Sequence, residues 1–178
     1  MPGGLELVEL GRVVKAHGLR GELLVAPHGG CLNALLRLSR VYLRRHAAKA
    51  KPWPVLSCRA HSGRVLMAVD GLDGRDKADP WRDAAVLARA RDVAAADPQH
   101  WGALAWIGAP VELSQGEILG ELRSVALVAG QELWTVVGAD GSRYVLPAAL
   151  RVQAVTDRLV IDPPEGLLEL CRQEDGAL

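Results

Sequence analysis

Short apolar segments, each followed within a few positions by turn residues, constrain the fold of this chain more than any other feature. They are rich in Val and Leu and recur at a spacing of roughly 8 to 12 positions, a pattern typical of β-strands. The pattern predicts an all-β protein. The segments lie at residues 5–16, 21–27, 39–45, 53–60 and 63–71, and again at residues 109–113, 120–128, 132–139, 143–147 and 157–164.

Two dipeptides, Ser62-Gly63 and Asp140-Gly141, lie between apolar segments and predict β-hairpins. Residues 165–171 predict one short amphipathic helix near the C-terminus. Both halves of the chain repeat short strands and tight turns, an arrangement that a small barrel satisfies by closing its sheet on itself. We predict an all-β fold of two small β-barrels in tandem, with short helical segments and a short C-terminal helix.

Residues 72–93 contain the best helical candidate of the first half. Asp73 is the predicted cap of this helix, because its side chain can accept from free backbone N–H groups of the first turn. Pro80 should kink or stop the helix, since it lacks a backbone donor. Residues 85–93 are expected to form another strand or a short extended piece.

The sign of the charge changes near residue 100. Up to that point the chain has 16 Lys and Arg against 10 Asp and Glu, and beyond it 5 against 11. A basic first barrel and an acidic second barrel indicate two modules with different partners. The predicted domains are residues 1–96 and 102–178, joined by a linker at residues 97–101.

The interval between Glu22 and Asp70 contains no acidic residue. Lys and Arg neutralise phosphates and release condensed counterions, so such an interval favours RNA contact, and Trp53 adds a ring that can stack on an unpaired base. The alternative is a solvated strand face with scattered charges. The basic residues of the interval are Arg37, Arg40, Arg44, Arg45, Lys49, Lys51, Arg59 and Arg64.

Cysteine usage and hydropathy exclude several classes of protein. Cys31, Cys58 and Cys171 are odd in number and far apart, which suits reduced thiols better than a disulfide framework or a zinc site. No apolar run reaches the roughly 18 to 20 residues that span a bilayer, and the start does not resemble a signal peptide. We expect a soluble cytoplasmic monomer with no membrane partner and no cofactor, metal or nucleotide.

The segment HGLRGE, His17 to Glu22, follows a Gly11-Arg12 pair, and the two together resemble the opening of the ribosome maturation factor RimM family. Segments of the second half resemble the opening and the close of the PRC-type barrel found in the same family. Each motif alone is weakly specific, but their order and spacing together are strong. These later segments are residues 106–122, 143–147 and 158–170.

The resemblance implies a RimM-type N-terminal barrel followed by a PRC-type barrel, and a protein that is not an enzyme. Members of this family bind the free small (30S) ribosomal subunit, assist assembly of its head and support processing of 16S rRNA. The resemblance therefore implies three partners, namely the small subunit, ribosomal protein S nineteen of the subunit head and 16S rRNA.

Candidate contacts follow from the basic interval and from the resemblance. The family usually has a Tyr-Tyr pair before the second barrel that matters for partner binding, and here those positions are Trp101 and Gly102. We predict that Trp101 and Trp106 bind the partner protein, with packing between the barrels as the alternative. The predicted RNA-binding residues are Arg12, His17, Arg20, Arg37, Arg44, Arg45, Lys49 and Lys51.

His17 has three interpretations. In the first, Gly18 and Gly21 turn the chain between two strands and His17 hydrogen-bonds across the loop. In the second, the exposed loop contacts RNA or protein through His17 and Arg20. In the third, the chain is a small hydrolase that uses His17 and Glu22. A general RNA-binding module without a ribosomal protein partner, and a purely protein-interaction module, are the remaining alternatives.

Overall fold

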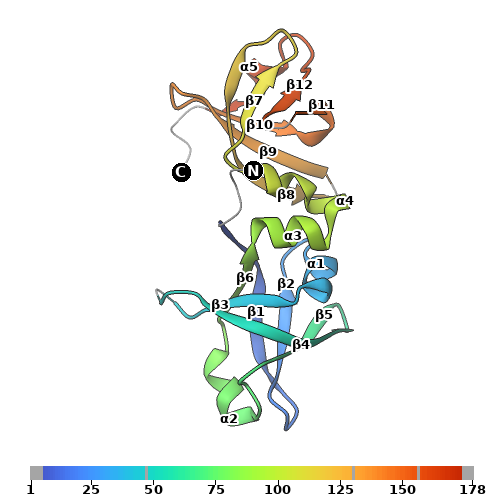
Figure 1. Ribbon diagram of the computed structural model, residues 1–178, viewed down its shortest axis with the longest axis vertical. Coiled ribbons are helices and arrows are strands. Elements are labelled where there is room, and N and C mark those ends of the chain that lie inside the picture. The colour runs from blue at the N-terminus through green and yellow to red at the C-terminus, as the bar shows by residue number, and fades with distance from the viewer. Residues whose placement is uncertain (1–5, 47, 130, 156, 174–178) are drawn as a thin grey trace. The chain divides into compact units, whose positions relative to one another are not determined.

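The computed structural model describes residues 6–46, 48–129, 131–155 and 157–173 (Figure 1). The chain divides into two compact units, of which the first ends at Pro98 and the second begins at Gln99. Strands dominate both units, so the predicted all-β fold class is confirmed. No helix among the described residues is long and apolar enough to cross a bilayer.

Six strands of the first unit close into a barrel in the order β1-β2-β5-β4-β3-β6 (Figure 1). Every neighbouring pair in the barrel is antiparallel, and β1 closes it by pairing with both β2 and β6. The strands are β1 (Leu7–His17), β2 (Glu22–Pro27), β3 (Arg40–Arg44), β4 (Lys51–His61), β5 (Arg64–Val69) and β6 (Ala85–Arg89).

Closure of the barrel depends on the middle of β1. Gly11 pairs with β2 on one side and with β6 on the other, and a Cβ on this residue would lie only 2.4 Å from the backbone oxygen of Ala26. The register shifts between Glu9 and Gly11 toward β6, and between Val13 and Lys15 toward β2. Because such bulges bend a strand and increase its twist, β1 can curve from one neighbour to the other.

Aliphatic side chains fill the interior of the barrel. They come from alternate positions of the strands, as expected for a sheet that buries one face. The chain has no Phe, and Val, Leu and Met side chains occupy this core instead. Fully buried members of this set are Leu23, Val25, Val41, Leu43, Val65, Met67, Val86 and Ala88.

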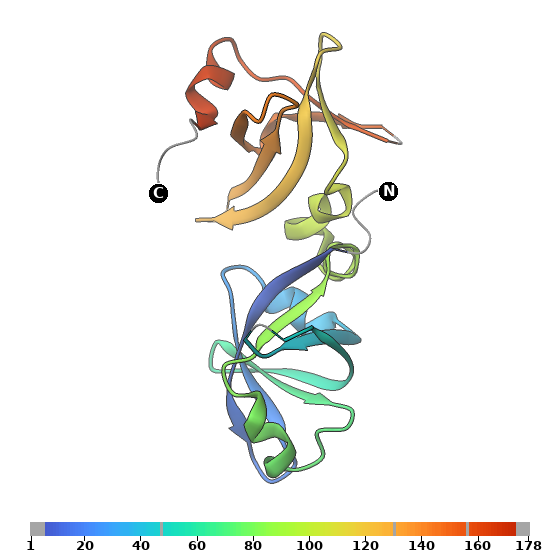
Figure 2. The same cartoon turned by 90° about the vertical axis from the view of Figure 1, so that its left-hand side faces the viewer.

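Four short helices cover the ends of the barrel. α1 and α3 lie side by side at one end, while α2 and the β1–β2 hairpin lie at the other (Figures 1 and 2). The helices are α1 (Leu32–Arg37), α2 (Arg75–Ala78), the 3₁₀ helix η1 (Asp79–Trp81) and α3 (Ala90–Ala96).

The helix predicted near Asp73 is shorter than expected and is capped differently. α2 ends at Ala78, and Pro80 lies in the 3₁₀ helix that follows, which confirms the predicted stop. The prediction that Asp73 caps the helix was wrong, because Gly74 is the N-cap residue and makes no side-chain capping bond. Asp73 instead accepts a hydrogen bond from Lys77 at 2.6 Å.

The expectation of an extended segment over residues 85–93 was half right. Residues 85–89 form β6, but α3 begins directly afterwards at Ala90. α3 buries Val93 and Ala94 on one face. Alanine has the highest helix propensity, and this alanine-rich run is therefore helical once its apolar face can pack on the barrel.

The second unit is a seven-stranded sheet in the order β11-β12-β7-β8-β9-β10-β13. β12 runs parallel to β7 and the other pairs are antiparallel, while β8 and β9 are long and curved (Figure 2). The strands are β7 (Pro110–Leu113), β8 (Ile118–Val128), β9 (Gln131–Val137), β10 (Arg143–Pro147), β11 (Arg151–Ala154), β12 (Leu159–Ile161) and β13 (Arg172–Gln173). The helices are α4 (Pro98–Trp101), η2 (Gly102–Trp106), η3 (Ala148–Leu150) and α5 (Leu167–Cys171).

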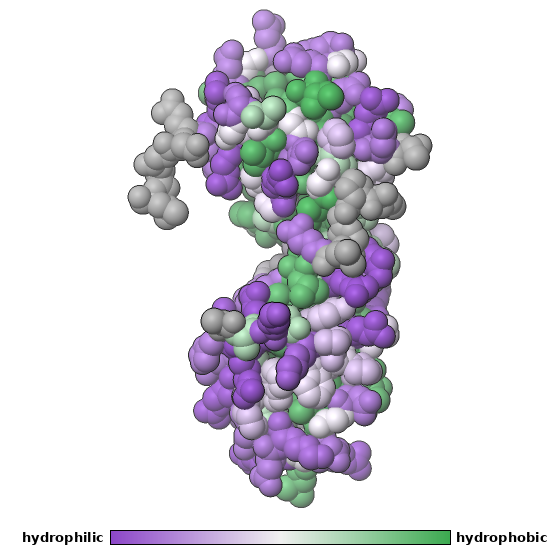
Figure 3. Space-filling model, turned by 60° about the vertical axis from the view of Figure 1, so that its left-hand side comes forward, coloured by the Kyte–Doolittle hydropathy of each residue, from purple (hydrophilic) through white to green (hydrophobic). Residues whose placement is uncertain are grey.

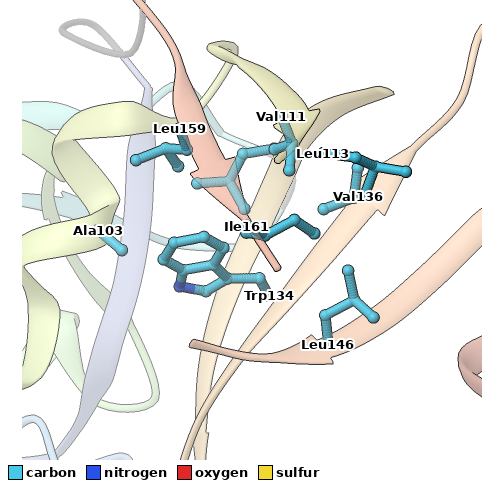
Figure 4. Packing of buried hydrophobic residues seen from close by; sticks show 9 residues of the cluster. Ala103, Val111, Leu113, Trp134, Val136, Leu146, Leu159 and Ile161 are labelled. Carbon is cyan, nitrogen blue, oxygen red and sulfur yellow. The ribbon is translucent and has the colours of Figure 1, made fainter. Parts of the chain in front are cut away.

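Trp134 is at the centre of the second unit's core. Its ring is 1% exposed and lies among aliphatic side chains from several strands and Ala103 of η2 (Figure 4). The indole Nε1 donates to Glu132 Oε1 at 2.7 Å, so the buried ring leaves no polar atom unsatisfied. Tryptophan therefore supplies aromatic bulk in a chain that has no Phe. The aliphatic members are Val111, Leu113, Leu122, Val136, Leu146, Leu159 and Ile161.

Both predicted hairpins and the C-terminal helix are confirmed. Ser62 and Gly63 join β4 to β5 with φ angles of +48° and +73°, and Gly141 has a φ of +83° between β9 and β10. Positive φ at both central residues is what a type I′ hairpin turn requires. α5 lies within the segment 165–171 where a helix was predicted.

Substitution of two glycines in the HGLRGE loop tests how closely this loop packs against residues 72–74. Both have positive φ, but a Cβ on Gly21 would lie 2.4 Å from the backbone oxygens of Leu72 and Gly74, whereas a Cβ on Gly18 would meet nothing within 4 Å. We expect Gly18→Ala to lower the free energy of unfolding by about 1 kcal/mol through backbone strain alone. Gly21→Ala should cost about 3 kcal/mol or more, because two carbonyls must also move.

Urea denaturation of the two variants, followed through the transition of the first unit, measures this difference. Equal destabilisation by the two substitutions would contradict the close packing of the loop against residues 72–74.

Candidate nucleic-acid interface

The eight residues predicted to bind RNA all lie on the first unit, whose visible surface is largely hydrophilic (Figure 3). Four of them, Arg12, His17, Arg44 and Arg45, fall into three groups of side chains that contact one another. We call these the Glu9 cluster (Glu9, Arg12, His28 and Arg44), the hairpin face (His17, Glu22, Arg59 and His61) and the loop cluster (Arg45, Trp53 and Trp81).

The Glu9 cluster joins two predicted RNA-binding arginines through one carboxylate. Glu9 Oε1 lies 3.3 Å from Arg12 Nε and 3.2 Å from His28 Nε2, and Glu9 Oε2 accepts from Arg44 Nη2 at 3.2 Å. Glu9 is only 26% exposed, while its arginine partners are about half exposed. Each arginine therefore keeps donors directed to solvent, and the cluster has a net positive charge.

The hairpin face lies at the ends of β1, β2 and β4. The rings of His17 and His61 are 5.6 Å apart between centroids and tilted by 54°. Arg59 donates to both oxygens of Glu22, with Nη2 at 2.9 Å from Oε2. The contact described for His17 is thus the ring of His61 and not the expected hydrogen bond across the loop.

The turn interpretation of the HGLRGE loop is confirmed by its backbone. Gly18 and Gly21 have φ angles of +67° and +76°, which only glycine adopts readily, and His17 pairs with Glu22 across the hairpin. Arg20 at the tip is exposed and has no ion-pair partner among the described residues. The loop therefore presents Arg20 and the highly exposed Leu19 to solvent.

The pKa of Glu22 does not suit a general base. Its hydrogen bond with Arg59 holds the pKa of the carboxyl group below the ordinary glutamate value. A general base that works near neutral pH needs a pKa raised toward the working pH, so the shift has the wrong direction. Glu22 and Arg59 act instead as a bidentate ion pair across the face of the sheet.

The loop cluster stacks a cation on an aromatic pair. The Arg45 guanidinium lies 4.9 Å from the Trp81 ring centroid, and the rings of Trp53 and Trp81 meet edge to face at 5.3 Å. Arg45 Nη1 also lies 3.5 Å from the backbone oxygen of Pro80. β3 and β6 are neighbours in the barrel, and their ends bring the β3–β4 loop to the segment that precedes β6.

A depression of about 360 Å³ lies beside this stack. Its walls combine three groups of basic character with one carboxylate: Arg45 and His46 come from the β3–β4 loop, and Arg82 and Asp83 come from the segment before β6. Neither Arg82 nor Asp83 forms an ion pair with any residue that the structure describes. Pro80, Ala48 and Ala84 complete the lining.

Two further predicted cations, Lys49 and Lys51, lie in or next to the same loop. Both side chains are exposed, and neither has an ion-pair partner within the described part of the chain. Arg37 differs from them, because its Nη1 donates to the backbone oxygen of Ala96 at 3.1 Å and so ties α1 to the end of α3. The cations without a described ion-pair partner thus include Lys49 and Lys51 at the β3–β4 loop as well as Arg20 at the tip of the HGLRGE loop.

The segment around Trp81 was not among the predicted site residues. It drew attention only because Pro80 interrupts the predicted helix. Asp83, two residues after Trp81, has a positive φ of +63°. Trp81 and Arg82, directly after Pro80, were the only local signal that could have pointed to this segment. Arg45, which stacks on Trp81, lies far away in the sequence.

The two tryptophans predicted to bind a partner differ in exposure. Trp101, the last residue of α4, is 7% exposed, so it can contact a partner only if the structure around it opens. Trp106 ends η2, is half-buried and packs against the core around Trp134. Trp106 thus combines a fixed position with an accessible surface.

Cys31 and Cys58 lack the lowered pKa of a reactive thiol. Burial raises the pKa of Cys31 and of Cys58 to about 11, so both thiols are protonated at neutral pH. Within the described residues, no group of three or more His, Cys, Asp and Glu side chains is arranged to hold a metal ion.

Comparisons with known proteins identify the family. Residues 8–93 match the model of the RimM N-terminal domain. A ribosome maturation factor RimM from Anaeromyxobacter dehalogenans is 36% identical over 168 residues, which cover 93% of this chain and 99% of that protein. The chain belongs to the RimM family. A second RimM protein, from Anaeromyxobacter sp. strain Fw109-5, is 33% identical over 167 residues and covers 91% of this chain and 98% of its own length.

RimM proteins also occur among similar solved structures. A RimM crystal structure from Pseudomonas aeruginosa is 21% identical, covers 88% of this chain and 97% of its own, and has a TM-score of 0.47. The N-terminal domain of RimM from Thermus thermophilus covers 49% of this chain and 94% of its own, with 23% identity and a TM-score of 0.42. Membership of the RimM family, predicted from the HGLRGE loop and the second-barrel segments, is confirmed by the sequence matches.

The Glu22–Arg59 pair gives this family member a testable pH response. Glu22 has a lowered pKa, so the pair stabilises the folded state above the ordinary glutamate pKa of 4.5 and loses this contribution as the pH falls through the lowered value. We expect Arg59→Ala to return the Glu22 pKa toward its ordinary value, as measured by NMR titration of the carboxyl carbon.

Arg64→Ala is the matched control, because Arg64 is also exposed on the neighbouring strand and has no ion-pair partner among the described residues. It should leave the Glu22 titration unchanged. An unaltered titration in the Arg59 variant would show that the pair does not exist in solution.

Proposed function

We propose that this protein is a ribosome maturation factor that binds the free small (30S) ribosomal subunit and assists assembly of its head and 16S rRNA processing. It acts by binding alone. The basic barrel holds rRNA of the head while the second unit binds ribosomal protein S nineteen, so that RNA and protein mature together. The shared name of the RimM relatives, ribosome maturation factor, supports the general role.

The observation that carries the RNA part of this proposal is the group of cations at the β3–β4 loop. Lys49, Lys51 and Arg82 are exposed without a described carboxylate partner, and Arg45 is held beside them on Trp81. Cations that are not already neutralised release the most phosphate counterions when RNA binds. Arg12, His17, Arg20, Arg37 and Arg44 belong to the same proposed RNA surface, with Arg37 as its most constrained member.

Charge and aromatic anchoring support the protein contact of the second unit. Beyond residue 100 the chain has 5 Lys and Arg against 11 Asp and Glu, and ribosomal proteins that bind RNA are basic. Complementary charge steers two such surfaces together and speeds their encounter. Trp106 is the accessible anchor in this proposal, and Trp101 fixes the start of the unit and contacts the partner only after local opening.

The same proposal describes a cytoplasmic monomer that needs no cofactor, metal or nucleotide. The lowered pKa of Glu22 and the protonated thiols of Cys31 and Cys58 support binding in place of catalysis, since none of these groups is prepared as a base or nucleophile. The alternative function is a general RNA-binding module without a ribosomal protein partner, which the same basic loop would also serve.

Co-sedimentation with free small subunits, free large subunits and whole ribosomes separates these two functions. We expect selective binding to free small subunits. Equal binding to all three particles would favour the general RNA-binding module, and binding to none would contradict both.

The double variant Lys49→Ala/Lys51→Ala tests which surface supplies the RNA contact. We expect weaker binding to free small subunits, and a plot of log affinity against log salt that is shallower by about 2, one unit for each lost phosphate contact.

Arg143→Ala/Arg151→Ala in the second unit is the matched control. It removes the same charge from exposed strand positions outside the barrel. An equal loss of salt dependence in the two double variants would contradict an RNA surface confined to the first unit.

A further inference from the structure

We propose that the depression beside the β3–β4 loop is a binding site for one unpaired guanine nucleotide of RNA, with the base stacked on Arg45. This inference rests on the proposed function, because it assumes that the basic barrel binds RNA. It goes further by assigning a site, a type of nucleotide and a role to residues that lie beside the general basic surface.

Arg45 provides a stacking surface that is already in position. One face of its planar guanidinium covers Trp81 at 4.9 Å, and the Pro80 oxygen lies 3.5 Å from Nη1. Arg45 also lines the depression. In the proposed site, the base stacks on the face of the guanidinium that Trp81 does not cover. Unpaired RNA bases stack on arginine planes as well as on aromatic rings.

The aromatic pair beneath Arg45 limits its motion. Trp53 meets Trp81 edge to face at 5.3 Å, and Gly71 lies so close to the Trp53 ring that a Cβ added to it would be 3.3 Å from a ring atom. A guanidinium held in this way loses little side-chain entropy when a base stacks on it. Stacking a base on Arg45 therefore costs less side-chain entropy than stacking it on a mobile surface arginine.

Arg82 and Lys49 supply positive charge for the phosphates of the same nucleotide. Arg82 lines the depression and Lys49 follows its lining residue Ala48 in the loop. Both side chains are exposed, with no ion-pair partner among the residues described. A phosphate at the rim can thus be neutralised while the base lies inside.

Asp83 determines which base is preferred. Among the described residues that line the depression it is the one acidic residue, and a carboxylate there repels a phosphate that enters alone. A carboxylate accepts hydrogen bonds, and guanine has two adjacent donors, N1–H and the 2-amino group, on its Watson–Crick edge. Adenine and uracil have no such adjacent pair, so the combination of Arg45 and Asp83 favours guanine.

The size of the depression suits a single nucleotide. Its volume of about 360 Å³ is at the lower end of the range of roughly 300 to 1,000 Å³ for small-ligand pockets. A base with part of its sugar fits such a space, whereas a duplex would have to lie across the rim.

Fluorescence anisotropy with the labelled single-stranded pentamers UUGUU, UUAUU and UUUUU, at one salt concentration, tests this site. We expect the full-length protein to bind UUGUU about tenfold more tightly than UUUUU, in line with the effect of one stacked and paired base. UUAUU should bind at an intermediate level, because adenine stacks without the two hydrogen bonds.

Two variants separate stacking from base recognition. Arg45→Lys keeps the charge but loses the planar face, so it should remove the tighter binding of UUGUU and UUAUU and leave UUUUU nearly unchanged. Asp83→Asn keeps a residue that tolerates the positive φ of +63°, and should abolish the difference between UUGUU and UUAUU. Arg64→Lys, at an exposed position on β5, is the matched control and should bind all three RNAs like wild type.

Equal binding of the three pentamers to wild type, or an Arg45→Lys variant that behaves like wild type, would overturn the nucleotide site. The same preparations are tested for binding to free small subunits. Subunit binding without a guanine preference refutes this site and leaves the proposed function standing. A guanine preference that is lost in both variants supports the site, even if the subunit is not bound and the proposed function fails.

Discussion

Closure of the first barrel at Gly11 is the constraint on which the rest of this unit depends. The residue pairs with β2 on one side and with β6 on the other, at a point where the backbone of Ala26 leaves no room for a Cβ. The two bulges on either side allow one strand to pair with both neighbours. Once the barrel is closed, alternate side chains point inward or outward, and the outward ones carry the charges. The Gly-Arg pair in the family motif thus has a physical reason for its glycine.

Closure also redistributes the charge along the chain. Arg44 and Arg59 lie in an interval without acidic residues, but β1 and β2 bring Glu9 and Glu22 to them across the sheet. The acid-free interval is therefore partly neutralised by carboxylates that lie before it in the sequence. Three cations that keep no carboxylate partner among the described residues, Lys49, Lys51 and Arg82, lie at or near the β3–β4 loop, where Trp81 stacks under Arg45. Local structure, and not the number of basic residues, decides which part of the surface suits RNA.

The sequence was sufficient for features that depend on neighbouring residues. Strand segments, the Ser62-Gly63 turn and the stop at Pro80 follow from short-range pattern and backbone chemistry. The stack of Arg45 on Trp81 depends on pairing between β3 and β6, strands that are far apart in the sequence, so no local pattern could predict it. α3 was missed because its apolar face stabilises the helix only when it packs on the barrel. For Trp101 the sequence left partner binding and packing open as alternatives, and only the structure shows that its side chain is buried.

We propose that the two units have different partners: the barrel contacts rRNA and the second unit contacts a protein. Site-specific photo-crosslinking on free small subunits tests it most directly, with a benzophenone amino acid placed at Lys49 or at Trp106. The account predicts that the probe at position 49 crosslinks to 16S rRNA and that the probe at position 106 crosslinks to ribosomal protein S nineteen. Protein crosslinks alone from position 49, or rRNA crosslinks alone from position 106, would contradict it.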